Sequence, residues 1–156
     1  MRILIQRVSH ASVKVDGAII GEIGFGLLAF VGIRETDTIE CVRWLAEKVA
    51  QIRIFEDSDG KMNLSAQDVG GSILAVSQFT LYGALPKGNR PSFMAAASPE
   101  KAEELYNEFL KLLIDRIGTA KVASGKFRAK MTVELTNEGP VTILLEKENS
   151  SLGNDE

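Results

Sequence analysis

The sequence predicts an α/β fold in which two helices pack on a sheet of many short strands. Three observations support this prediction. Apolar and polar residues alternate near both ends of the chain, two segments between them repeat apolar residues at helical spacing, and two short apolar runs are typical of buried strands. A chain of 156 residues has the length of one domain. We therefore expect a single domain over residues 1–146 and a polar, fraying tail over residues 147–156.

Composition narrows the class of protein. Hydrophobic residues make up 45% of the chain and charged residues 25%, which are ordinary globular values and exclude a disordered or fibrous chain. Cys41 is the single cysteine, so no intrachain disulfide can form, and no paired Cys/His spacing indicates zinc. The longest apolar run, residues 25–33, is far short of the roughly 20 residues that span a membrane. We expect a soluble, cytoplasmic protein with no membrane partner.

The first 33 residues predict four short strands. Alternating apolar residues mark strands over residues 2–8, 11–15 and 18–23, and a continuous apolar run predicts a buried strand over residues 27–33. The Ser9-His10 step is expected to separate the first two strands, and Asp16-Gly17 predicts a hairpin turn before the third.

Two segments predict helices. Apolar residues at helical spacing from Ile39 to Ile52 follow Thr36 and Asp37, either of which is a candidate N-cap. The second helix begins with Ser98 as N-cap and Pro99 at its first position, and it ends at Gly118. Its expected buried stripe consists of Ala102, Leu105, Phe109, Leu112, Leu113 and Ile117.

Short strands are expected between and after the helices. Residues 53–55 predict a strand closed by the turn at residues 57–60, and residues 72–76 predict a buried strand that delivers residues 77–81 (SQFTL) at its end. The ends of strands are where α/β proteins often keep ligand sites. The long loop that follows, residues 82–93, is of a length that is usually functional or disordered.

The C-terminal part predicts strands near residues 121–124 and 131–135, then a third after a Gly-Pro step. Alternation on both sides of Gly139-Pro140 favours strand, tight turn, strand. Bonds to proline are the peptide bonds with an appreciable cis population, and glycine before them removes a crowding Cβ. By itself this motif predicts a plain hairpin.

The residue chemistry leaves two hypotheses open. The single histidine, His10, lies in a break between strands, and no Ser-His-Asp, Cys-His or paired-carboxylate spacing is present. One hypothesis is a hydrolase that uses Ser77 or Thr80. The other is a non-catalytic binding module that uses the basic loop at Lys87, Asn89 and Arg90. Net charge is −3, so nucleic-acid binding would need such a local patch, and a second candidate patch contains Lys121, Lys126, Arg128 and Lys130.

A resemblance decides between these hypotheses. Residues 77–81 (SQFTL) together with residues 137–142 (NEGPVT) resemble the two signature motifs of the D-aminoacyl-tRNA deacylases, historically called D-tyrosyl-tRNA deacylases. The likeness extends to residues 6–8 (QRV), residues 88–93 (GNRPSF) and residues 127–131 (FRAKM). One departure is Arg128, where the family pattern has glycine; it adds a positive charge on the side from which tRNA is expected to approach.

The resemblance implies a three-layer β/β/α sandwich with two main helices on a mixed sheet. It also implies a homodimer in which each active site lies at the subunit interface and takes residues 77–81 from one subunit and the Gly139-Pro140 turn, with a cis bond, from the other. The site residues that it implies are catalytic Ser77, Gln78, Phe79 and Thr80, and substrate-binding Arg7, Phe127, Met131, Asn137, Gly139 and Pro140. No metal or organic cofactor is implied.

The activity implied is hydrolysis of the ester between a D-amino acid and the 3′ end of tRNA. Backbone N–H groups near Phe79 and Thr80 would polarise the ester carbonyl while water attacks, assisted by the ribose 2′-hydroxyl. The Pro140 turn, braced by Arg7, would clash with an L side chain and leave a D side chain free, so many D-amino acids and also glycine should be accepted. The alternative that remains is a non-catalytic RNA-binding module.

Overall fold

The computed structural model describes residues 1–149, and it divides them into eight strands, two α-helices and two short 3₁₀ helices. The strands are β1 (Arg2–Val15), β2 (Ala18–Ile23), β3 (Gly26–Gly32), β4 (Phe55–Glu56), β5 (Met62–Leu64), β6 (Ser72–Ser77), β7 (Val122–Ser124) and β8 (Thr132–Glu146). The helices are α1 (Ile39–Gln51), η1 (Phe79–Tyr82), α2 (Pro99–Ile117) and η2 (Thr119–Lys121).

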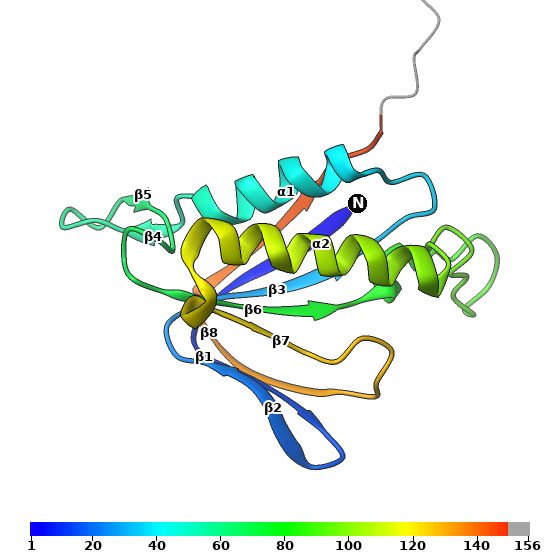
Figure 1. Ribbon diagram of the computed structural model, residues 1–156, viewed down its shortest axis with the longest axis horizontal. Coiled ribbons are helices and arrows are strands. Elements are labelled where there is room, and N and C mark those ends of the chain that lie inside the picture. Colours follow the sequence, from blue (N-terminus) through cyan, green and yellow to red (C-terminus); the bar gives the residue numbers. More distant parts are fainter. Residues whose placement is uncertain (150–156) are drawn as a thin grey trace, which may run out of the picture.

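One mixed sheet forms the centre of the molecule. Its strands follow the order β2-β1-β3-β6-β7, and β8 pairs with β1. The pairs β3–β6 and β6–β7 are parallel, whereas β1 pairs antiparallel with β2, β3 and β8. Both α-helices lie side by side on one face of this sheet (Figure 1). The prediction of two helices on a mixed sheet is therefore confirmed.

The second β layer arises because β1 and β8 each bend and continue past the central sheet. Residues 2–8 of β1 pair with β3, but residues 11–15 pair with β2, and β8 accompanies β1 through both halves. In Figure 1 the two strands run to the left edge and then turn below the sheet. The result is the three-layer β/β/α arrangement that the family resemblance implies.

Two hydrophobic cores hold these layers together. The larger lies between the helices and the sheet and contains Val42, Leu45 and Val49 of α1 together with Leu105, Phe109 and Leu113 of α2. The smaller lies between the two β layers and contains Val8, Ala11, Val13, Ile23, Leu28, Leu74 and Val76. Because β3 and β6 bury both of their faces, they have the continuous apolar sequences from which they were predicted.

The structure differs from the predicted strands in several ways. β4 begins only at Phe55, the last residue of the strand predicted over residues 53–55, and β5 was not predicted. The first two predicted strands are one, since β1 runs through Ser9 and His10. The expected break is instead where β1 stops pairing with β3 and starts pairing with β2, and where its register with β8 shifts. The predicted hairpin at Gly139-Pro140 is wrong. The segments on either side of it do not pair with each other but follow one another along β1, which supplies the hydrogen bonds to both.

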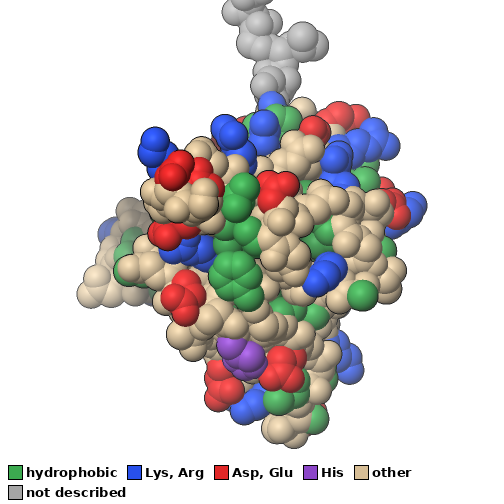
Figure 2. Space-filling view, turned by 90° about the vertical axis from the view of Figure 1, so that its left-hand side faces the viewer, with side chains coloured by type: hydrophobic (Ala, Val, Ile, Leu, Met, Phe, Trp, Pro, Cys, Tyr) green, Lys and Arg blue, Asp and Glu red, His purple; other side chains and the backbone are tan. Residues whose placement is uncertain are grey.

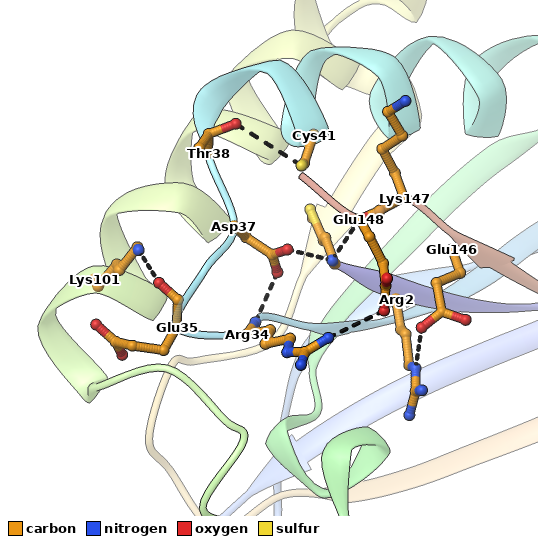
Figure 3. Close-up of polar contacts among 11 residues, drawn as sticks. Arg2, Arg34, Glu35, Asp37, Thr38, Cys41, Lys101, Glu146, Lys147 and Glu148 are labelled. Atoms are coloured by element: carbon orange, nitrogen blue, oxygen red, sulfur yellow. Dashed lines mark hydrogen bonds and ion pairs between the residues drawn. The ribbon is translucent and has the colours of Figure 1, made fainter. Parts of the chain in front are cut away.

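The helix boundaries agree with the sequence except at the start of α1. Its N-cap is Thr38, not Thr36 or Asp37. Asp37 is instead buried, where its carboxylate accepts hydrogen bonds from the Met1 ammonium at 2.5 Å and from the Arg34 backbone N–H at 2.7 Å (Figure 3). As predicted, the second helix begins at Pro99 and is followed by Gly118, which has φ 94° in the structure. The Ser98 side chain, the predicted N-cap, makes no cap hydrogen bond.

The predicted tail begins with a paired residue. Lys147 donates its backbone N–H to the Met1 carbonyl at 3.0 Å, and its own carbonyl accepts from the Met1 ammonium at 2.7 Å. Glu148 and Asn149 are also described, and residues 150–156 of the predicted tail lie outside the described residues. Within residues 1–149, neither helix has the length and apolar composition needed to cross a membrane.

Candidate active site

A cavity of about 580 Å³ lies where β3 and β6 end. It is enclosed by η1, the start of α2 and the segment that leads into β8. Its lining is mainly apolar and includes Val31, Val76, Phe79, Phe93, Ala102, Phe127, Met131 and Val133. A concave, apolar site of this volume with a few polar groups at its rim is typical of small-molecule sites.

Ser77, Gln78 and Phe79 line this cavity, and Thr80 follows them just outside its lining. β6 ends at Ser77, and the Gln78 N–H still donates to the Val31 carbonyl at 2.7 Å before the chain turns into η1. Phe79 and Thr80 are the first residues of η1, so their backbone N–H groups have no acceptor within the helix, and none elsewhere in residues 1–149. Two adjacent N–H donors are therefore available beside the cavity.

The aromatic rings at the mouth of the cavity pack edge to face. Phe79 is 58% exposed, and its ring centroid lies 5.2 Å from that of Phe93 at an interplanar angle of 75°. Phe93 is the last residue of the predicted loop 82–93, and no sequence signal indicated a role for it. The start of α2 also contributes Pro99 and Ala102, which no sequence signal marked as cavity residues.

Among the residues that the structure describes, none that lines the cavity is suited to act as a general base. Of the described residues that line it, only Arg128 carries a charge, and none is His, Asp or Glu. The Thr80 hydroxyl accepts a hydrogen bond from the Gln78 side-chain amide. His10 is exposed in the second β layer and bonds Glu22 at 2.7 Å. The residues described also contain no group of three or more His, Cys, Asp or Glu placed to hold a metal ion.

Phe127 and Met131, from the segment that leads into β8, also line the cavity. The Phe127 ring lies 5.8 Å from Tyr106, whose buried hydroxyl donates to the Ala75 carbonyl at 3.0 Å. Burial raises the pKa of Tyr106 above its ordinary value, so it stays neutral. Tyr106 was not in the predicted buried stripe, because a tyrosine in a helix does not by itself indicate burial. In the structure its hydroxyl joins α2 to β6.

The second motif forms a bulge in β8. Thr142 pairs with Gln6 and Asn137 with Val8, so residues 138–141 stand opposite Arg7 alone. The Asn137 side chain closes the bulge: its Oδ1 accepts the Val141 N–H at 2.7 Å, and its amide donates to the Val141 carbonyl at 3.2 Å. The Gly139–Pro140 peptide bond is cis, and Gly139 has φ 131°.

Arg7 holds this bulge from the inside. Its side chain is buried, with an exposed fraction of 8% for the residue. Its Nε donates to the Glu138 carbonyl at 3.0 Å, and its Nη1 donates to the Ile54 carbonyl at 2.8 Å. A buried guanidinium needs such acceptors, and here both are backbone oxygens.

The two motifs lie toward opposite ends of the central sheet. Ser77 pairs with Val31, which pairs with Ile3, whereas the bulge faces Arg7, four residues farther along β1. In Figure 1 the cavity end of β6 is on the right and the bend of β8 on the left. Figure 2 shows the left end, where hydrophobic side chains form a strip bordered by charged ones. One chain therefore brings Ser77, Gln78, Phe79, Phe127 and Met131 together in the cavity lining, with Thr80 next to Phe79 but outside the lining. It holds Arg7, Asn137, Gly139 and Pro140 together at the bulge of β8.

The two predicted basic patches differ in their relation to the cavity. Lys87, Asn89 and Arg90 are exposed, and none of them lines it. Arg128 does line it, and Lys126 and Lys130 flank Arg128 as exposed residues. Lys121 is turned away, since its ammonium donates to the Gly70 carbonyl at 2.7 Å.

Comparison with known proteins gives a consistent result. A family profile described as D-Tyr-tRNA(Tyr) deacylase matches residues 4–146. A D-aminoacyl-tRNA deacylase of Chloroherpeton thalassium is 56% identical over 94% of this chain and 95% of its own length. One from Geobacillus sp. is 49% identical over 97% of this chain and 98% of its own length.

Two solved structures share the fold. One is titled c-Myc DNA Unwinding Element Binding Protein and has a TM-score of 0.90 at 41% identity, covering 96% of this chain and 100% of that one. The other is titled as a probable eukaryotic D-amino acid tRNA deacylase; it has a TM-score of 0.82 at 18% identity, covering 92% of this chain and 97% of that one.

Proposed function

The chain belongs to the D-Tyr-tRNA(Tyr) deacylase family, and on that premise we propose that it hydrolyses the ester bond between a D-amino acid and the 3′ end of tRNA. The observation that carries this proposal is the cavity at the end of β6. It offers two unpaired backbone N–H groups, at Phe79 and Thr80, and no side-chain base. Such a site suits a substrate that is already activated, as an aminoacyl ester is.

The hydrolysis uses the backbone of η1 as an oxyanion hole. The N–H groups of Phe79 and Thr80 donate to the ester oxygen as negative charge develops on it, and the ester carbon is attacked by water. The ribose 2′-hydroxyl at the end of the tRNA assists the leaving oxygen. Phe79, Phe127 and Met131 hold the terminal nucleotide and exclude bulk water around the reacting ester.

Chiral selection requires a second subunit. Within one subunit, the bulge at Gly139 and Pro140 lies toward the opposite end of the central sheet from Phe79 and cannot reach the cavity. In a homodimer, the bulge of one subunit enters the cavity of the other. With the α-amino group and the ester fixed, an L side chain points into the Pro140 turn and a D side chain points away from it. Glycine, which has no side chain to clash, is accepted as well.

Asn137 and Arg7 keep the bulge in shape. Asn137 bonds both backbone groups of Val141, and Arg7 bonds the Glu138 carbonyl, so the loop cannot retreat from an incoming L side chain. Rejection by clash depends on this stiffness. The enzyme works where tRNA is charged and used, which assigns it to the cytoplasm, and its reaction needs no metal or organic cofactor.

The decisive experiment compares D-tyrosyl-tRNA with L-tyrosyl-tRNA. Each is incubated with the protein, and release of tyrosine is followed over time. We expect rapid release from the D substrate and little release above the uncatalysed rate from the L substrate. Equal hydrolysis of both would contradict the chiral gate while leaving the esterase intact.

The second candidate function is nucleic-acid binding without hydrolysis. It is favoured by the solved relative whose title names binding to a DNA unwinding element. The same assay separates the two, because this candidate predicts a stable complex with D-tyrosyl-tRNA and no release of tyrosine. Binding measured by filter retention, with and without the aminoacyl group, would then show whether the tRNA body alone is the ligand.

A further inference from the structure

One cation, Arg128, lines the cavity and has no partner within the described residues 1–149. Arg128 lines the cavity and is exposed, and within residues 1–149 its guanidinium forms no hydrogen bond or ion pair. Lys126 and Lys130, two residues away on either side, are exposed, and neither ammonium forms an ion pair within the same residues. Three cations thus lie within five residues beside a cavity whose lining is mainly apolar, and Arg128 is the one that lines it.

The backbone at Arg128 is in a conformation that arginine disfavours. Its φ of 66° lies in the left-handed region, where glycine is the usual residue. The turn is tight, since the Ala129 N–H donates to the Lys126 carbonyl at 3.2 Å. Phe127 and Ala129, on either side, face the cavity. A long cationic side chain at a position that favours glycine is an outlier that points to a function for the side chain.

We propose that Arg128, with Lys126 and Lys130, binds the phosphates of the single-stranded 3′ end of the substrate as it enters the cavity. This inference rests on the proposed function. A chain with net charge −3 attracts a polyanion only through a local patch, and these three cations form one beside the cavity. The planar guanidinium of Arg128 can bind phosphate oxygens in a bidentate manner, and Lys126 and Lys130 add charge on either side.

The test compares Arg128→Gly on two substrates. One is D-tyrosyl-tRNA, and the other is the D-tyrosyl ester of adenosine, which has no phosphate. We expect kcat/KM for the tRNA to fall about five- to tenfold near 0.1 M salt, mainly through KM, and several-fold more than for the adenosine ester. The slope of log kcat/KM against log salt should become shallower by about 0.7 for each phosphate that the variant no longer binds. Arg128→Lys keeps the positive charge and should recover much of the kcat/KM for the tRNA and much of its salt dependence.

The matched control is Lys111→Ala, which removes one positive charge from an exposed position of α2 outside the cavity lining. It should change kcat/KM for the tRNA less than twofold. An equal loss on both substrates for Arg128→Gly would overturn the inference and assign Arg128 to the shape of the cavity. An unchanged salt slope, or a change in subunit association measured by sedimentation, would overturn it too. If the unaltered chain hydrolyses neither D ester, the proposed function itself fails.

Discussion

Arg7 donates from its Nε to the backbone oxygen of Glu138 at 3.0 Å, one residue before the Gly139–Pro140 step. Its Nη1 donates to the Ile54 carbonyl at 2.8 Å, so a single buried side chain joins the bulge of β8 to the segment before β4. Neither oxygen belongs to a charged group. The position of the guanidinium is therefore fixed by backbone geometry, and the bulge is fixed by the guanidinium in return.

Replacing Arg7 should loosen the bulge and destabilise the fold. We expect Arg7→Met to lower the free energy of unfolding by about 2–4 kcal/mol, because it removes two hydrogen bonds of a charged group in a buried place. Selectivity should also fall, with L-tyrosyl-tRNA hydrolysed faster relative to the D substrate. Urea unfolding and the ratio of the two hydrolysis rates check this. Arg34→Met is the control, since the Arg34 pair with Glu148 is largely exposed and should contribute about 0–1 kcal/mol.

Asn137 offers a graded test of the same bulge. Asn137→Ala removes the acceptor for the Val141 N–H and should cost about 1–2 kcal/mol of stability, with a parallel loss of selectivity against L-tyrosyl-tRNA. Asn137→Asp keeps that acceptor but loses the amide donor to the Val141 carbonyl, so its effects should be intermediate. If Asn137→Ala retained full selectivity, stiffness of the bulge would not be what rejects the L side chain.

The regular elements of the fold could be predicted because local signals agree with the tertiary environment. Pro99 and Gly118 mark the ends of α2, Asp16-Gly17 forms the β1–β2 turn with positive φ at both residues, and the apolar runs of β3 and β6 match strands buried on both faces. The bulge of β8 could not be predicted, because alternation on both sides of a Gly-Pro step looks the same in a hairpin and in a strand that follows a neighbour. Only the pairing with β1 separates the two.

The sequence could indicate which strand leads into the cavity, but not which residues of other elements close the cavity. The 77–81 segment follows a recognisable buried strand, so its place at a sheet edge could be inferred. Phe93 and Ala102 line the cavity from a loop and a helix. The positions of these two elements depend on long-range packing, which the periodicity of the sequence does not reveal. The same holds for Asp37, which has the sequence signature of an N-cap but binds the Met1 ammonium.

The buried pair between the Met1 ammonium and Asp37 should be costly to break. Both side chains are almost completely buried, and Asp37 also accepts the Arg34 N–H. Asp37→Ala leaves a buried cation without its counter-charge, for which about 3–5 kcal/mol is typical. Thermal and urea unfolding measure the loss. Glu148→Gln, which alters only the exposed pair with Arg34, should change stability by less than about 1 kcal/mol.

The β4–β5 turn should contribute a pH-dependent part of the stability. Hydrogen bonds lower the pKa of Asp57 below its ordinary 3.8. The largest effect comes from the Asn63 side chain, and backbone N–H groups add smaller ones. Its contribution is therefore present above pH 3.8 and disappears as the pH falls through the lowered folded-state value. Asp57→Asn should destabilise the protein at pH 6 and differ less from the unaltered chain at pH 2. A difference of equal size at both values would contradict this assignment.

Thr80→Ala should retain activity within about tenfold of the unaltered enzyme. Removing a true nucleophile typically costs several orders of magnitude in rate. Within residues 1–149, however, no base lines the cavity to activate Thr80, and the Thr80 hydroxyl already accepts a hydrogen bond from Gln78. The backbone N–H of residue 80, which the proposed mechanism uses, is untouched by the change. Single-turnover hydrolysis of D-tyrosyl-tRNA measures the rate, with Ser77→Ala as the matched hydroxyl deletion. A loss of several orders of magnitude, together with a D-tyrosyl ester trapped on Thr80, would replace the oxyanion-hole mechanism with covalent catalysis.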